Sequence, residues 1–238
     1  MEIQIAVSKI NKYASSESGD TFEVVERPNG GLSVVLADGQ TSGHGAKAIS
    51  TLVVRKVISL LAEGIRDGAA ARAASDYLYT EKNGKVSATL NIFSIDFQTK
   101  TLVICRNNPA PVYISLGETI DLLTQPSEPI GTNRNIRPTI SEIAISIGLT
   151  AVMFSDGLTT AGGRKGLHLD IRTTLEALLE DSQPTPQHIA DSLLGMAMKL
   201  DDNRPMDDIS IVVLRVVQNE ADQTRRMLVR LPVPDIYQ

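Results

Sequence analysis

The sequence has 238 residues, of which 42% are hydrophobic and 21% charged, and its formal net charge is −5. This length suffices for one large domain with a sizeable core, and the mildly acidic balance disfavours nucleic acid or an anionic membrane as the main partner. The single cysteine, Cys105, lies in an apolar run, and no window approaches about 18 consecutive apolar residues. We therefore expect a cytoplasmic protein without a disulfide, a signal peptide or a membrane span.

The first third of the chain predicts strands followed by helices. Apolar and polar residues alternate over residues 3–10, and two β-rich runs between residues 21 and 38 flank an Asn-Gly turn, which is typical of a hairpin. The hydrophobic period then becomes helical over residues 45–62. A second, alanine-rich helix is expected over residues 69–79.

The rest of the chain repeats this order. Short strand-like runs between residues 87 and 156 indicate an antiparallel meander. Helices are expected over residues 169–180 and after Thr185, a candidate N-cap followed by proline. A strand is expected over residues 209–217, and residues 219–238 contain a candidate edge strand and a tail. The pattern predicts a single α+β domain over residues 1–238, a four-layer α-β-β-α sandwich of two antiparallel sheets flanked by helix pairs.

Aspartates recur where the predicted strands meet loops. They are Asp20, Asp38, Asp156, Asp207 and Asp208. Any one of them is more simply explained as a turn cap than as a functional group. Several at one rim of the sandwich would repel one another unless a hard divalent cation lay between them. Gly39, which has no Cβ, would let its carbonyl approach such a cation.

The motifs "ADG…SGHGAKA", "NNPAPVYI", "FSDGLTTA" and "DDISIVVL", in this order, resemble those of the metal-dependent PP2C-like (PPM) serine/threonine phosphatases. The similarity is greatest to the bacterial SpoIIE/RsbU/RsbX branch and covers residues 16–217. It implies two Mn²⁺ or Mg²⁺ ions at the edge of a β-sandwich. Asp38 would bridge both ions, and the Gly39 carbonyl would bind the second. Asp156 and Asp207 would complete the first.

The same resemblance implies lesser roles for two further aspartates. Asp20 would hold a metal-bound water, and Asp208 would lie behind the ligands as a supporting neighbour. The choice of Asp207 over Asp208 as the ligand rests on motif alignment alone.

Enzymes of this family hydrolyse phosphoserine and phosphothreonine through a metal-bridging hydroxide, because the ions lower the pKa of the bound water. The chain is most similar to stand-alone stressosome feedback phosphatases, which implies phosphorylated STAS-domain proteins of a stress-response pathway as substrates. Two alternatives remain open at this point. One is a non-catalytic phosphoprotein-binding module, and the other is a metal phosphoesterase for a small metabolite.

The sequence departs from the family pattern near the first motif, where Gln40 and Thr41 resemble an insertion. His44 could protonate the leaving alkoxide as a general acid, but we favour a loop residue near the start of the first helix. Arg164 and Lys165, in "AGGRKG", could approach a phosphopeptide. For them we favour a solvated, glycine-rich flap.

Overall fold

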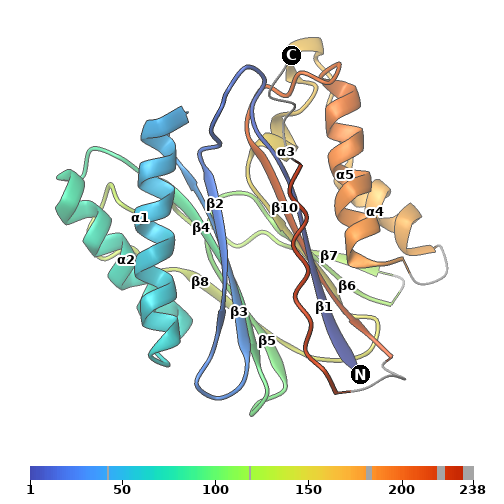
Figure 1. The fold of residues 1–238 in the computed structure, drawn as a ribbon, viewed down its shortest axis with the longest axis horizontal. Helices are drawn as coiled ribbons and strands as arrows, with labels where there is room; N and C mark the ends of the chain where they lie inside the picture. Colours follow the sequence, from blue (N-terminus) through green and yellow to red (C-terminus); the bar gives the residue numbers. More distant parts are fainter. Residues whose placement is uncertain (42, 118, 181–183, 219–222, 233–238) are drawn as a thin grey trace.

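The structure, a computed structural model, describes residues 1–41, 43–117, 119–180, 184–218 and 223–232. Two five-stranded antiparallel sheets pack face to face, and each carries helices on its outer side (Figure 1). The first sheet has the strand order β1 (Glu2–Ile10), β10 (Ile209–Val217), β9 (Thr150–Phe154), β6 (Val112–Leu116) and β7 (Thr119–Leu123). The second has the order β2 (Asp20–Glu26), β3 (Leu32–Gly39), β4 (Ala88–Asp96), β5 (Thr101–Asn107) and β8 (Thr139–Ala144).

The helices form the two outer layers. They are α1 (Gly43–Ala62), α2 (Asp67–Lys82), α3 (Gly157–Thr160), α4 (Ile171–Glu180) and α5 (Pro186–Leu200), with a 3-10 turn, η1 (Gly163–Lys165). The first two cover the second sheet, and α4 and α5 cover the first (Figure 1). The expected four-layer α+β sandwich is confirmed.

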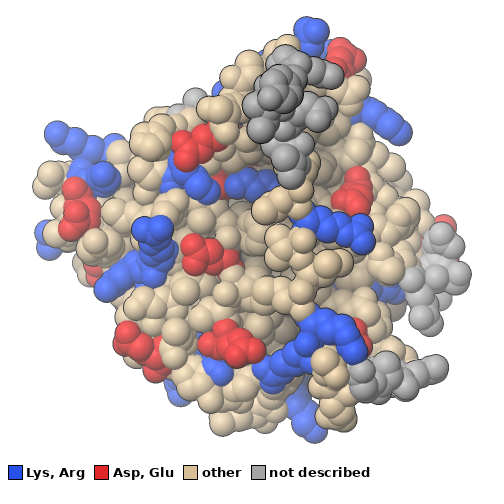
Figure 2. Space-filling view, viewed as in Figure 1, with Lys and Arg blue, Asp and Glu red and all other residues tan. Residues whose placement is uncertain are grey.

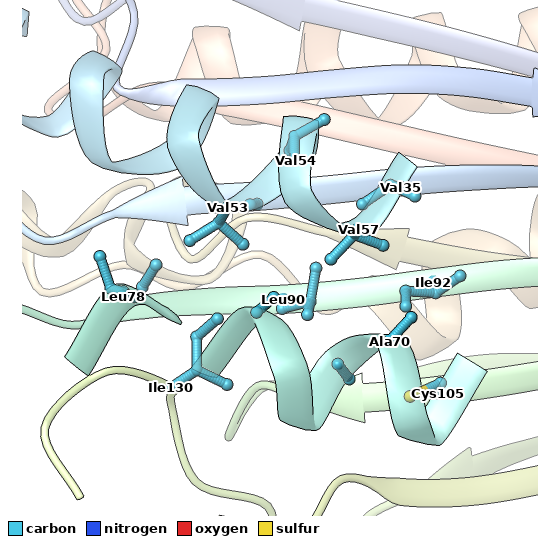
Figure 3. Close-up of a cluster of buried hydrophobic side chains, with 14 of the residues drawn as sticks. Val35, Val53, Val54, Val57, Ala70, Leu78, Leu90, Ile92, Cys105 and Ile130 are labelled. Atoms are coloured by element: carbon cyan, nitrogen blue, oxygen red, sulfur yellow. The ribbon is translucent and has the colours of Figure 1, made fainter. Parts of the chain in front are cut away.

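Three apolar layers hold these elements together. Between the sheets, side chains such as Leu36, Phe93 and Leu214 are buried against one another. The α1–α2 pair packs on the second sheet through a cluster that includes Val53 and Leu90 (Figure 3). A third cluster lies under α4 and α5. Because the central strands are covered on both faces, they read as continuous apolar runs rather than as alternating ones.

Local signals fix several element ends where the sequence predicts them. The Oγ1 of Thr185 accepts a hydrogen bond from the His188 amide at 3.1 Å, and Pro186 occupies the first helical position of α5. Gly64 follows α1 with a φ of +84°, the left-handed conformation that ends helices. In the β2–β3 hairpin, the amide of Arg27 donates to the Gly31 carbonyl at 2.8 Å.

The expected meander is wrong as a continuous path. The chain leaves the second sheet after β5, forms β6 and β7 in the first sheet, returns for β8 and crosses again to β9. β8 is an edge strand whose side chains alternate between exposed and half-buried. Each run was recognisable as a strand, but its sheet depends on partners distant in sequence, which local composition does not encode.

The candidate edge strand near the C-terminus is not formed over residues 223–232. The rest of that segment, residues 219–222 and 233–238, lies outside the described residues. Arg225 ties the described stretch to the β2–β3 hairpin, because it donates to the Gly30 carbonyl at 2.8 Å and pairs with Glu26 at 3.4 Å. The apolar side chains that follow Arg225 are largely exposed.

Strand directions bring several chain segments to one end of the sandwich. β3 and β9 end there, while β2 and β10 begin there, and the first turn of α1 and the short α3 lie at the same end (top of Figure 1). The face shown in Figure 2 carries acidic and basic side chains interspersed, with no extended field of one sign. Among the helices of the described residues, none combines the length and the apolar content needed to cross a bilayer.

Candidate functional site

Five aspartates meet at this end of the sandwich, and we call them the acidic rim: Asp20, Asp38, Asp156, Asp207 and Asp208. Asp20 and Asp38 lie directly opposite each other on the neighbouring strands β2 and β3. Asp156 follows β9, and the last two precede β10, the antiparallel neighbour of β9. The antiparallel pairing therefore gathers residues that are far apart in the sequence.

Asp38 is half-buried at the centre of the acidic rim. Burial and the neighbouring Asp20 carboxylate raise the pKa of Asp38 to about 9. Asp156 and Asp207 add further like charge on its other sides. The carboxyls of Asp20 and Asp156 lie close enough to Asp38 for each pair to influence each other's protonation. Carboxylates this close repel one another unless a proton or a cation compensates their charge, so the site favours positive charge at this point.

Asp156 experiences the same conflict more weakly. Burial raises its pKa, and the next contribution in size is the negative charge of Asp207. The amide of Gly157 donates a hydrogen bond to Asp156 and offsets part of this shift. Asp38, Asp156 and Asp207 thus face one another without enough protein cations between them to neutralise their charge.

Asp20 is fully buried, and two hydroxyl groups hold it. Its Oδ2 accepts hydrogen bonds from Ser155 Oγ at 2.8 Å and Ser210 Oγ at 2.6 Å. Its Oδ1 is buried and has no hydrogen-bond partner among the described residues. Burial raises the pKa of Asp20 to about 6, although both hydroxyls favour the charged form. One oriented but unsatisfied carboxylate oxygen therefore points to a ligand that is not part of the chain.

Asp208 has a different environment, because both of its oxygens bind the backbone. Oδ1 accepts from the Lys12 amide at 2.9 Å, and Oδ2 accepts from the Gly19 amide at 2.8 Å. The side chain is 5% exposed. Asp208 thus fixes the β1–β2 loop and the residue immediately before Asp20, and no oxygen of it is left without a partner.

Two lysines reach the same point from different layers. Lys9 of β1 and Lys47 of α1 both donate to the main-chain carbonyl of Asp20, at 2.7 and 2.9 Å. Lys47 also donates to Thr21 Oγ1 at 2.8 Å. Burial and the charge of Lys47 lower the pKa of Lys9, and the carboxylates of the acidic rim oppose that shift. The two ammonium groups connect the halves of the sandwich and partly balance the acidic charge.

Glycines after two of the aspartates permit close backbone packing. A Cβ on Gly39 would lie 2.1 Å from the Ala46 carbonyl oxygen of α1, and a Cβ on Gly157 would lie 2.1 Å from that of Asp208. Any larger residue at either position would push the adjoining aspartate out of place. The need for Gly39 thus comes from helix packing as well as from the access to its carbonyl that the sequence indicated.

The insertion after Asp38 is anchored to the neighbouring strand. Gln40 Oε1 accepts from the Ser87 amide at 2.9 Å, and Thr41 has a φ of +83°. His44 lies in the first turn of α1, where its ring is 93% exposed and its Nδ1 is 3.0 Å from Glu17 Oε2. This position agrees with the interpretation of His44 as a residue at the helix start. Arg164 and Lys165 lie in η1, which follows α3 and is exposed.

The donor set suits a hard divalent cation, which prefers carboxylate and carbonyl oxygens. As the side chains stand, the described residues contain no group of three or more His, Cys, Asp or Glu that could hold a metal ion. The Asp20 oxygen that lacks a partner in the described part of the chain and the raised pKa of Asp38 both mark a place for positive charge.

Sequence reasoning missed the supports of this site. Ser155 and Ser210 stand inside the motifs "FSDG" and "DDIS", so their position beside the aspartates was a usable signal. Lys9 and Lys47 carried no such signal, because lysines on a strand and a helix are usually solvated. Cys105, which lies at the α2 face of the second sheet, is buried as expected and takes no part in the site.

Comparisons with known proteins agree with this architecture. The family model described as Stage II sporulation protein E (SpoIIE) matches residues 28–217. A curated relative, Stage II sporulation protein E of Bacillus subtilis, is 22% identical over 222 residues. That match covers 93% of this chain but only 26% of the relative, so the chain spans about a quarter of that protein's length.

Two solved structures show the same fold. The PP2C phosphatase domain of SpoIIE from Bacillus subtilis, solved with a fragment of its regulatory domain, matches with a TM-score of 0.79 at 20% identity. That match covers 92% of this chain and 64% of the other. The catalytic domain of the serine/threonine protein phosphatase PstP, solved with two manganese ions, matches with a TM-score of 0.69 at 18% identity and covers 91% and 99% of the two chains.

Proposed function

Because the chain belongs to the SpoIIE family of PP2C-type phosphatase domains, we propose that it is a metal-dependent protein phosphatase that hydrolyses phosphoserine and phosphothreonine. One observation carries the proposal. Burial and three neighbouring carboxylates raise the pKa of Asp38, and the oriented oxygen of Asp20 has no hydrogen-bond partner among the described residues. Such an arrangement costs free energy when no cation is bound, and it is suited to binding one.

Five groups of this chain would hold the ions. They are the carboxylates of Asp38, Asp156 and Asp207, the carbonyl of Gly39, and, through water, the carboxylate of Asp20. Bound Mn²⁺ or Mg²⁺, two ions by analogy with the PstP domain, would supply an activated water and positive charge opposite the phosphoryl oxygens.

The remaining residues orient these groups. Ser155 and Ser210 fix the free oxygen of Asp20 in one direction, and the two lysines hold its main chain from β1 and α1. Asp208 keeps the adjoining loop against β10. His44 contacts Glu17 and is almost fully exposed, so we assign it to the start of α1 and not to proton transfer.

We propose the substrate class from the motif resemblance. The series of motifs is most similar to stressosome feedback phosphatases, which makes phosphorylated STAS-domain proteins of a stress-response pathway the first substrates to test. The direct readout is intact mass after incubation with Mn²⁺. Loss of a single phosphate from one such protein, and not from unrelated phosphoproteins, is the expected result.

The test of the chemistry compares a phosphoserine peptide with a sugar phosphate and a nucleotide. We expect Mn²⁺-dependent release of phosphate from the peptide, loss of activity in chelator and recovery with excess Mn²⁺. Asp38→Asn should abolish turnover, whereas the matched variant Asp76→Asn, on the exposed side of α2, should not. Turnover in chelator would refute the mechanism. Preference for the small phosphates would favour a metabolite phosphoesterase, and peptide binding without hydrolysis a binding module.

A further inference from the structure

A hollow of about 280 Å³ opens between η1 and the end of α5. It is lined by Arg164, Lys165, Leu200, Asp201, Asp202 and Arg204. The yellow-orange turn η1 and the end of α5 come together at the top of Figure 1, at the same end as the acidic rim. The three basic side chains are all exposed, so they are accessible to a ligand from solvent.

The walls of this hollow are joined to the acidic rim. Asp201 accepts hydrogen bonds from the Gly162 amide at 2.9 Å and from the Met206 amide at 3.3 Å. One of these donors lies shortly after Asp156, and the other immediately precedes Asp207. The buried carboxylate of Asp201 therefore links the segment after Asp156 to the segment before Asp207, the two proposed ligands. The hollow lies on the outer side of this link.

The same walls are tied to the β1–β2 loop. The Tyr13 amide donates to the Pro205 carbonyl at 2.9 Å, and the Arg204 guanidinium stacks over the Tyr13 ring at 5.3 Å from its centroid. A stacked guanidinium has a fixed plane and keeps its N–H groups free at the edge. Arg204 is thus held in place by an aromatic ring and not by an acid.

Both carboxylates that line the hollow already have partners within the chain. Asp201 binds two backbone amides, and Asp202 pairs with Lys165 at 2.6 Å. Across the residues that the structure describes, Arg164 and Arg204 have no carboxylate partner. The hollow consequently presents two guanidinium groups without a carboxylate partner among those residues, and its lining carries a net charge of +1.

We propose that this hollow is an accessory subsite for an anionic group of the substrate, located a few residues from the phosphate that is removed. The inference rests on the proposed phosphatase function and deepens it, because it makes the substrate class phosphopeptides with a carboxylate or a second phosphate near the target residue. Guanidinium groups bind both anions through paired, charge-assisted hydrogen bonds.

The test uses the full chain loaded with Mn²⁺ and three phosphoserine peptides that differ only in their flank. One flank carries aspartates, one a second phosphoserine and one only alanines, and p-nitrophenyl phosphate serves as a substrate too small to span both places. For the wild type we expect KM about tenfold lower with an anionic flank than with alanines, the factor given by one charge-assisted contact. The two anionic arms show whether carboxylate or phosphate is preferred.

The paired variant is Arg164→Ala with Arg204→Ala, and Arg55→Ala on the exposed side of α1 is the matched control. The double variant should lose the preference for anionic flanks and keep kcat, as well as its rate with p-nitrophenyl phosphate. When Arg204→Ala is combined with Arg164→Lys instead of Arg164→Ala, part of the preference for anionic flanks should return, because lysine retains the positive charge. A merely structural role would lower the rate with all substrates alike.

Two results would overturn the subsite. Equal KM for all three flanks in the wild type is one, and an unchanged flank preference in the double variant is the other. Failure of the wild type to hydrolyse any substrate, p-nitrophenyl phosphate included, would instead count against the phosphatase function. In that case, binding of the fluorescent peptides, measured by anisotropy, still decides the subsite through the same comparison of flanks and variants.

Discussion

Two kinds of aspartate stand side by side in the acidic rim, and they differ in how the chain treats their charge. Asp208 is almost completely buried, yet both of its oxygens accept backbone hydrogen bonds. Asp38 is less buried, but it faces the carboxylates of Asp20, Asp156 and Asp207, and its pKa rises to about 9. Burial alone thus does not separate a structural carboxylate from a functional one.

The two residues differ in whether the protein itself supplies the groups that compensate the negative charge of the carboxylate. Around Asp208 the protein itself provides the donors, so the group stabilises the fold as it stands. Around Asp38 the protein provides further negative charge, so the group is stable only with a proton or an added cation. Neutralising each residue should therefore have opposite effects on the stability of the metal-free protein.

The largest effect is expected from Asp38→Asn. Activity on a phosphopeptide should fall by at least about 100-fold, since a proposed ligand of both ions is lost. In chelator, the same variant should be more stable than the wild type by about 1 kcal/mol, because the neutral amide needs neither a proton nor a cation to be stable at this position. Urea unfolding and a phosphate-release assay measure the two effects. A variant destabilised in chelator would break the comparison.

Asp208→Ala should give the reverse sign in stability. The amides of Lys12 and Gly19 lose their acceptors, which we expect to lower the free energy of unfolding by about 2–4 kcal/mol. Added Mn²⁺ should not restore this loss. Asp208→Asn, which keeps one acceptor oxygen, serves as the graded control and should lose less. If Asp208→Ala unfolds at the same urea concentration as the wild type, Asp208 is not an anchor.

The smallest effect is expected from His44→Ala. The ring is 93% exposed, and its partner among the described residues is Glu17, itself partly exposed. Surface substitutions of this kind change free energies by less than about 0.5 kcal/mol, so kcat should stay within about twofold of the wild type. Glu17→Ala is the matched control and should behave alike. A loss of about 100-fold in kcat would instead identify His44 as the general acid.

Much of the fold was predictable, because local patterns act within each element. The helical period marked α1 and α5, the Asn-Gly turn marked the β2–β3 hairpin, and Thr185 with Pro186 marked a helix start. The assignment of β6, β7 and β8 to sheets was not predictable in this way. Their runs are short, and the choice of sheet depends on contacts between segments distant in sequence.

The candidate site, too, was predictable from the sequence only in part. The recurrence of aspartates at strand ends, with glycines behind two of them, could be read directly from the residues, and it indicated a rim of oxygen ligands. Which aspartate is anchored and which is left facing like charge depended on the antiparallel pairing of β2 with β3 and of β9 with β10. The lysines that reach Asp20 from β1 and α1 depended on it too.

By itself, then, the sequence determined the types of element, their order and the stock of acidic groups, since propensity and hydrophobic period are properties of neighbouring residues. Only the tertiary structure decided which of those groups share one electrostatic environment. Coulomb interaction and desolvation depend on distances in space, and the crossing of the chain between two sheets is what sets those distances.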